Sequence, residues 1–236
     1  MNIARTRKTY KAICSLVVFM EVTLHSSNNA INPSGIQNPN PFESVHQAAI
    51  RGSGNRPQTV HSSHYSFERY PENETKISMP FKDITSIDSN IKRLVNLEKL
   101  CLRNNKLKLL PAEIGELKNL QELHLSGNKL KSLPAEIGRL ETLQKLHLNL
   151  NKLKSLPAEI GKLKNLQYLY LDYNKLKLLP VEIGEMRNLQ KLHLSGNKIE
   201  ILPAEIGNLK NLNILDLSNN KLKLLPAEIG ELKNLQ

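Results

Sequence analysis

The chain has 236 residues, of which 39% are hydrophobic and only 4% aromatic, with no tryptophan. Lys and Arg total 33 against 22 Asp and Glu, which gives a net charge of +11. A basic chain is attracted to acidic partners, but so few aromatic side chains leave little to stack on bases, so we expect no nucleic-acid partner. The two cysteines, Cys14 and Cys101, are too few for a disulfide framework.

Residues 1–30 are typical of a secretory leader. Basic residues up to Lys11 precede a run without charge from Ala12 to Met20. This run is far shorter than the ~20 apolar residues that span a bilayer, so we expect no membrane contact beyond the leader. The prediction is a signal peptide on a secreted protein; the alternative is a basic or amphipathic leader on a cytoplasmic protein.

Residues 31–75 are rich in Asn, Pro, Ser and Gly, as in Asn38–Pro41 and Gly52–Pro57. Such a segment buries too little apolar surface to offset chain entropy, so we predict a disordered linker. Between residues 76 and 96, apolar residues recur 23 positions before matching residues downstream, as Ile84 does before Leu107. This divergent copy predicts an N-terminal cap for the repeats that follow.

A 23-residue unit repeats without insertion over residues 97–236, in six full copies and the start of a seventh. In each copy apolar and polar residues alternate at first, which predicts a short strand with one buried face. A proline then precedes apolar residues three apart, such as Ile137 and Leu140, which predicts a short helix or 3-10 turn. Gly138, between those two, predicts a tight or left-handed turn. The stacked copies predict a solenoid with a parallel sheet.

An asparagine occupies the ninth position of every copy, where the chain turns after the strand. Its amide is expected to pair with backbone groups of this turn, each of which would cost about 1–3 kcal/mol if buried unpaired. This predicts a structural ladder formed by Asn105, Asn128, Asn151, Asn174, Asn197 and Asn220.

The pattern Leu-x-x-Leu-x-Leu-x-x-Asn-x-Leu resembles the leucine-rich-repeat superfamily. Leu-Pro-Ala-Glu-Ile-Gly-x-Leu-x-Asn-Leu resembles its 23-residue class, found in Ras-suppressor-like, plant Ras-group and bacterial proteins. The resemblance implies an α/β leucine-rich-repeat solenoid with a curved parallel sheet on the concave side and short turns on the convex side. It also implies a non-catalytic protein-interaction module, without a cofactor; the alternative is a cytosolic signalling scaffold of the Ras-suppressor-like kind.

The outward strand positions of a solenoid form its usual binding surface, the concave face. His124 and His147 are expected to be neighbours there, but two histidines without a third ligand make a poor zinc site, so we predict no metal. Cys101 is expected to be an exposed thiol without a paired base. Tyrosines gather in the fourth repeat and offer the rigid aromatic area that binding favours, although they also suit a merely polar surface. The predicted partner-binding residues are Tyr168, Tyr170, Tyr173, Asp172, His147, His193 and His124.

The last copy ends at Gln236 without a polar capping segment. Its apolar residues are therefore expected to meet solvent at an unpaired sheet edge. This pattern indicates a fragment of a longer array, or self-association through the uncapped C-terminal end.

Overall fold

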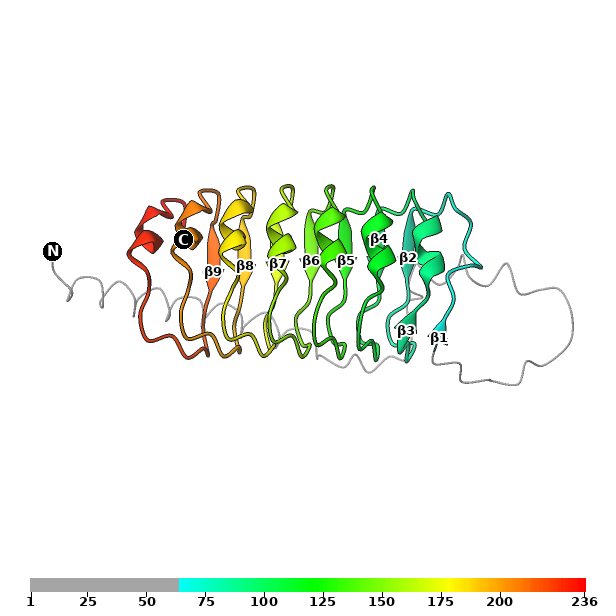
Figure 1. Cartoon of the computed structure of the whole chain (residues 1–236), viewed down its shortest axis with the longest axis horizontal. Coiled ribbons are helices and arrows are strands. Elements are labelled where there is room, and N and C mark those ends of the chain that lie inside the picture. The colour runs from blue at the N-terminus through cyan, green and yellow to red at the C-terminus, as the bar shows by residue number, and fades with distance from the viewer. Residues whose placement is uncertain (1–63) are drawn as a thin grey trace, which may run out of the picture. The chain divides into compact units, whose positions relative to one another are not determined.

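The computed structural model describes residues 64–236 (Figure 1). The leader predicted for residues 1–30 and most of the linker predicted for residues 31–75 lie outside the described residues. Within residues 64–236, no helix is both long enough and apolar enough to cross a bilayer.

Seven short strands form one parallel sheet in which each strand pairs with the next one along the repeats (Figure 1). The pairing keeps a constant register, so Leu100 lies beside Leu123 and Leu123 beside Leu146. The strands are β2 (Lys76–Ser78), β4 (Lys99–Cys101), β5 (Glu122–His124), β6 (Lys145–His147), β7 (Tyr168–Tyr170), β8 (Lys191–His193) and β9 (Ile214–Asp216). The predicted parallel sheet and solenoid are confirmed.

Each repeat returns through a five-residue 3-10 helix, which confirms the short turns predicted from the sequence. In the third of them, the Pro134 carbonyl accepts a hydrogen bond from the Ile137 N–H at 3.1 Å, and the Ile137 carbonyl accepts from the Leu140 N–H. Ile137 and Leu140 are fully buried, as their spacing predicted. The helices are η1 (Ser89–Arg93), η2 (Ala112–Glu116), η3 (Ala135–Arg139), η4 (Ala158–Lys162), η5 (Val181–Glu185), η6 (Ala204–Asn208) and η7 (Ala227–Glu231).

Of the two turns predicted for Gly138, the structure shows the tight one, within η3, and not the left-handed one. The φ of Gly138 is not positive, since the only glycines with positive φ among the described residues are Gly127 and Gly196. A Cβ at Gly138 would instead collide with the backbone carbonyl of Glu159 in the next 3-10 helix. Glycine is therefore needed here so that successive turns can approach closely.

The asparagine amides make the hydrogen bonds expected of them, and these bonds reach into the neighbouring repeat. The Asn128 Oδ1 accepts from the Leu107 N–H at 3.0 Å. Its Nδ2 donates to the carbonyls of Leu102 and Leu125 at 2.9 and 3.0 Å. Each amide thus closes its own turn and ties it to the repeat before it. The same arrangement is found at all six positions: Asn105, Asn128, Asn151, Asn174, Asn197 and Asn220.

Residues 64–75, which we predicted to belong to the linker, fold against the first repeats. A short strand, β1 (His64–Tyr65), pairs with β3 (Ser86–Ile87). The fully buried Phe67 ring packs against both Tyr65 and Tyr70, with ring centroids 5.5 and 6.0 Å away. The linker prediction is wrong for this part, because the polar composition of the longer segment masked three aromatic residues that together bury a hydrophobic surface.

The cap continues through residues 76–96, which take the shape of a repeat despite their divergent sequence. Ile84, Ile91 and Leu94 are almost completely buried, as their counterparts in later repeats are. The Tyr70 hydroxyl donates to the Met79 Sδ at 3.3 Å and lies 3.0 Å from the Tyr65 hydroxyl. Burial, followed by this tyrosine pairing, raises the Tyr70 pKa. At this end of the repeats, Phe67 joins the hydrophobic core, and Tyr65 and Tyr70 pack against it.

Candidate protein-binding surface

One column of side chains runs along the sheet, one from each strand from β4 to β9. The strand register places them side by side in the order Cys101, His124, His147, Tyr170, His193 and Asp216. We call this column, with the residues that flank it on the same strands and the turns just after them, the sheet face. Cys101 is buried, with only 8% of its surface exposed, so the prediction of an exposed thiol is wrong. Its short side chain lies between β2 and β5 instead of at an open edge.

Four rings of this column form a continuous stack. The centroid of His124 lies 4.3 Å from that of His147, with an interplanar angle of 19°. Tyr170 follows 4.5 Å beyond His147, and His193 follows 4.9 Å beyond Tyr170. These spacings match the distance of about 4.8 Å between neighbouring strands. The sheet thus presents an aromatic strip assembled from four separate repeats.

The surroundings of the first two histidines of the strip favour their uncharged form. Burial lowers the pKa of His124, and its hydrogen bond to Glu122 only partly opposes this effect. Burial, followed by repulsion from His124, lowers the pKa of His147 to about 4. The strip therefore offers aromatic area and neutral hydrogen-bonding atoms rather than positive charge in its first half.

Glu122 forms a compact charge cluster beside His124. Its carboxylate lies 2.6 Å from the Lys99 Nζ, 2.8 Å from the Lys145 Nζ and 3.1 Å from the His124 Nε2. Hydrogen bonds from Lys145 first, and then Lys99, lower the Glu122 pKa. Glu122 was not among the predicted binding residues, although Lys, Glu and Lys follow one another in one column of the aligned copies and so indicate an alternating charge ladder.

Two of the three predicted tyrosines lie on strand β7, and the third lies in the turn that follows it. Tyr168 and Tyr170 lie two apart on β7 and are half-buried, so they point to the same side of the sheet. The Tyr168 hydroxyl donates to the Gln190 Oε1 at 3.4 Å, and the Lys191 Nζ lies 5.7 Å from the Tyr168 ring. Tyr173 lies in the turn after the strand and is 58% exposed.

Tyr173 and Leu150 occupy the same position in adjacent repeats, and both have a left-handed backbone. Their φ angles are 54° and 58°, and their exposed fractions are 58% and 53%. A left-handed conformation costs an L-residue with a Cβ about 1–2 kcal/mol. Four other copies have Asn or Gly here, which tolerate this backbone better: Asn104, Gly127, Gly196 and Asn219. A bulky apolar side chain kept exposed at that cost indicates a functional position.

The next repeat makes room for the Tyr173 ring. A Cβ at Gly196 would lie 2.7 Å from the Tyr173 Cδ1, so the ring packs over this glycine. Leu150 was missed by sequence reasoning. The sequence signal that could have identified it is a leucine at a position where four other copies have Asn or Gly, which suit a positive φ.

At the other end of the sheet face, the predicted residues Asp172 and His193 meet Asp216. One ligand atom from each of the three lies within 4.8 Å of the other two. The Asp172 Oδ1 accepts a hydrogen bond from the Ser195 N–H at 3.0 Å, and the Asp216 Oδ1 accepts from the Ser218 N–H at 2.9 Å. Burial raises the pKa of Asp172, against the attraction of His193.

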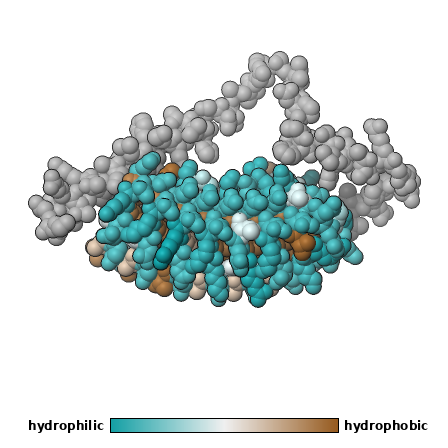
Figure 2. All heavy atoms as spheres, turned by 90° about the horizontal axis from the view of Figure 1, so that it is seen from above, coloured by the Kyte–Doolittle hydropathy of each residue, from teal (hydrophilic) through white to brown (hydrophobic). Residues whose placement is uncertain are grey.

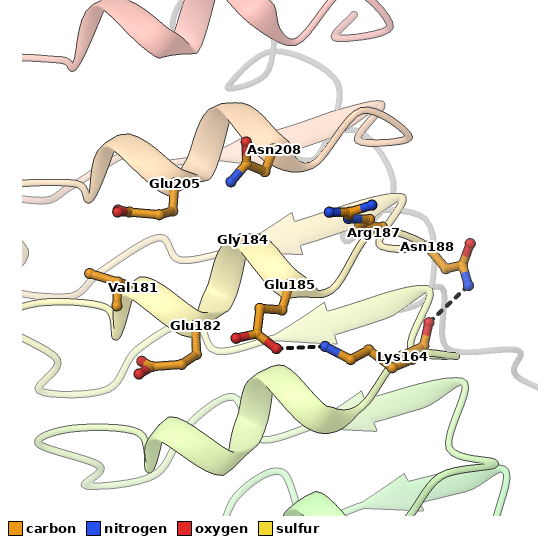
Figure 3. A pocket seen from close by; sticks show the side chains of 9 residues that line it. All are labelled: Lys164, Val181, Glu182, Gly184, Glu185, Arg187, Asn188, Glu205 and Asn208. Carbon is orange, nitrogen blue, oxygen red and sulfur yellow. Dashed lines mark hydrogen bonds and ion pairs between the residues drawn. The ribbon is translucent and has the colours of Figure 1, made fainter.

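A cleft of about 610 Å³ lies on the opposite side of the molecule, among η5, η6 and the preceding repeat (Figure 3). Inside it, Lys164 points at Glu185, and the Lys164 Nζ lies 2.6 Å from the Glu185 carboxylate. Several lining residues, such as Glu182 and Gly184, recur at the same place in other repeats. The cleft therefore follows from the repeat geometry, and we place the candidate site on the sheet face.

Hydrophilic residues cover most of the surface seen in Figure 2, with hydrophobic residues scattered among them. Scattered apolar residues are ordinary on a protein surface. Exposed large apolar residues on a left-handed backbone are found at Phe81, before the first full repeat, and within the repeats at Leu150 and Tyr173.

Family models described as leucine-rich repeats match residues 95–137, 141–199 and 187–235. The chain belongs to the leucine-rich-repeat family. The matched residues cover the six repeats that form β4–β9 and their 3-10 helices. A comparison with curated protein sequences finds no match.

Solved structures of other leucine-rich-repeat proteins share the fold. A Leptospira interrogans leucine-rich-repeat protein is 42% identical, with a TM-score of 0.54, over 68% of this chain and 47% of that one. The ectodomain of an Arabidopsis thaliana membrane receptor kinase, in complex with Casparian strip integrity factor 2, is 34% identical, with a TM-score of 0.57, over 68% of this chain and 22% of that one. A plant peptide hormone receptor in complex with RGF2 is 27% identical, with a TM-score of 0.57, over 68% and 29%. The chain thus spans less than half the length of each of these proteins.

Proposed function

We propose that this leucine-rich-repeat protein is a non-catalytic module that binds a protein or peptide through its sheet face. The observation that carries the proposal is the pair Leu150 and Tyr173, two large apolar side chains held in solvent on a left-handed backbone. They lie just after β6 and β7, beside the stack of His124, His147 and Tyr170. Aromatic and apolar anchors next to a polar rim are the usual composition of an interface centre.

The structural neighbours support the same class of function. Two of them are receptor structures in complex with Casparian strip integrity factor 2 and with RGF2. Each is more than 25% identical to this chain over about two thirds of its length. We therefore favour a polypeptide ligand over a small molecule.

A pull-down with the full chain as bait tests this proposal. The variant Leu150→Ala with Tyr173→Ala should lose the partners that the wild type retains, because it removes both exposed anchors. The matched control is Leu109→Ala with Leu178→Ala, which removes two apolar side chains of similar exposure, 59% and 57%, away from the sheet face. Identical partners for the wild type and the Leu150–Tyr173 variant would contradict the proposal.

We further propose that the protein is secreted, on the basis of the basic and apolar residues of its first 20 positions. The alternative is a cytoplasmic signalling scaffold of the Ras-suppressor-like kind. N-terminal sequencing of the protein recovered from its producing cell separates the two. A mature chain that begins after the apolar run supports secretion, and one that begins at Met1 contradicts it.

We further propose that two copies of the chain associate through the last repeat. Leu215, Leu217 and Leu222 are only partly buried, whereas Leu192, Leu194 and Ile199 are completely buried at the same positions one repeat earlier. A second copy packed on this surface would cover them. Light scattering that shows only monomers at high protein concentration would contradict this proposal.

A further inference from the structure

The cluster of Asp172, His193 and Asp216 goes beyond protein binding, because it joins three metal-ligating side chains from neighbouring repeats. Asp172 follows β7, His193 lies on β8 and Asp216 lies on β9. We propose that these three residues form a binding site for a divalent transition cation of the zinc type. The proposal does not depend on whether a protein partner binds the sheet face.

The geometry suits a small cation. Three atoms that all lie within 4.8 Å of one another share a centre no more than about 2.8 Å from each. Zinc–ligand distances are about 2.0–2.2 Å for imidazole nitrogen and carboxylate oxygen, so each ligand atom needs to move inward by less than about 1 Å. Movements of this size are within reach of side-chain torsions and leave the strands in place.

The three side chains are already held in position by their surroundings. Each carboxylate has one oxygen anchored by a backbone N–H, from Ser195 for Asp172 and from Ser218 for Asp216. The His193 ring is stacked on Tyr170. Contacts of this kind orient metal ligands and commonly affect metal affinity by 10–100-fold.

The charge around the cluster also favours a cation. No Lys or Arg within residues 64–236 forms an ion pair with Asp172 or Asp216. Asp216 is only 6% exposed, and the two carboxylates repel each other. A bound dication would neutralise both carboxylates, as Lys99 and Lys145 do for Glu122 at the other end of the sheet.

The donor set selects the class of metal. Imidazole nitrogen and carboxylate oxygen are both zinc donors, and three protein ligands would leave a fourth coordination position open. Calcium takes six to eight oxygen ligands, more than this cluster offers, and magnesium prefers carboxylate and water oxygens to an imidazole nitrogen. The open position would hold water or a carboxylate or imidazole from a partner.

Titration of the full chain with Zn²⁺ and Co²⁺ after removal of metals by a chelator tests the proposal. Calorimetry should show one Zn²⁺ equivalent that is lost, or weakened at least about tenfold, in each of Asp172→Asn, His193→Gln and Asp216→Asn. Co²⁺ should give visible absorption bands of a low-coordinate site that disappear in the same variants. Because the comparison is between variants of one chain, histidines elsewhere contribute equally to both sides.

His147→Gln is the matched control, since it removes a histidine of the same column that has no second carboxylate beside it. It should retain the Zn²⁺ equivalent. Zn²⁺ should also raise the melting temperature of the wild type but not that of His193→Gln, and circular dichroism checks that each variant is folded. If Asp216→Asn fails to fold, Asp172→Asn and His193→Gln decide the question. Equal Zn²⁺ stoichiometry and affinity in the wild type and His193→Gln would overturn the proposal.

Discussion

The two halves of the sheet face share one backbone and differ in how they balance charge. In the first half, Glu122 lies between Lys99 and Lys145, and this carboxylate is fully neutralised by side chains of the chain itself. In the second half, Asp172 and Asp216 flank His193 without a neighbouring Lys or Arg ion pair among the described residues. In the first half the lysines outnumber the carboxylate that they pair with, whereas the second half is left with negative charge that an external group can neutralise.

This difference shows how a regular solenoid acquires distinct surfaces. The buried leucines, the asparagine amides and the 3-10 helices are nearly identical in both halves. We call these shared elements the frame. Only the outward positions vary, and a substitution there costs little stability because the frame stays intact. The following predictions test the frame first and then the charge balance of each half.

The largest effect should come from the frame, equally in the two halves. Asn151→Ala and Asn197→Ala should each lower the free energy of unfolding by about 2 kcal/mol, because each leaves one backbone N–H buried without a partner and removes one of the two amide donors from each of two buried carbonyls. Urea denaturation measures this. The control Asn165→Ala removes an exposed amide bond to the Glu141 carbonyl and should cost less than about 1 kcal/mol. Unequal losses at Asn151 and Asn197 would mean that the halves differ in their frames as well.

The pH dependence of the first half should follow His147. Its folded-state pKa of about 4 lies below its unfolded value of 6.5, so the stability it contributes is present above pH 6.5 and lost as the pH falls towards 4. With solvent screening of this half-buried ring, the loss should reach about 1–2 kcal/mol. His147→Tyr keeps an aromatic ring in the stack, as Tyr170 does one repeat later, and should flatten the unfolding curve over this range. An unchanged pH dependence would show that His147 is not the responsible group.

Removing the charge of Glu122 should destabilise the first half. Glu122→Gln leaves Lys99 and Lys145 without an anionic partner and should cost about 1 kcal/mol at pH 7, since both lysines are partly exposed, at 45% and 41%. The lowered pKa of Glu122 means that this stabilisation is present above its unfolded pKa of 4.5 and is lost as the pH falls through its folded value. Thermal unfolding of the variant at pH 7 and at low salt measures the loss, and high salt should reduce it.

Removing the charge of Asp172, in the second half, should instead stabilise the protein. The pKa of Asp172 is raised, so its ionised form opposes folding, and the stability it contributes at low pH is lost as the pH rises through its folded value. In a metal chelator at pH 7, Asp172→Asn should therefore raise the free energy of unfolding by about 0.5–1 kcal/mol. The asparagine oxygen can still accept the Ser195 N–H. A loss of stability in this variant would remove the proposed contrast between the halves.

Sequence reasoning predicted the frame well because each of its elements depends on a local pattern. The strands, the 3-10 helices and the turn amides follow from residue types at fixed positions in a unit that repeats without insertion. The close approach of Gly138 to Glu159 was not predicted, because Glu159 lies in the next repeat. Phe67 was assigned to a linker because an isolated buried aromatic carries no periodic signal.

The candidate site was predicted only in part. The order of the column from Cys101 to Asp216 follows from the repeat length, and the structure reproduces it. Leu150 was missed because its importance depends on a φ angle, and the burial of Cys101 was missed because it depends on neighbouring strands.

By itself, the sequence determined the solenoid: a 23-residue period of leucines can bury its apolar side only by stacking, and that stacking decides which residues share a column. Only the tertiary structure decided which side chains in and around those columns interact. The neutralisation of Glu122, the stacking of four rings and the approach of Asp172 to His193 and Asp216 all depend on side-chain torsions. These torsions are set by contacts between repeats, and no pattern within one repeat encodes them.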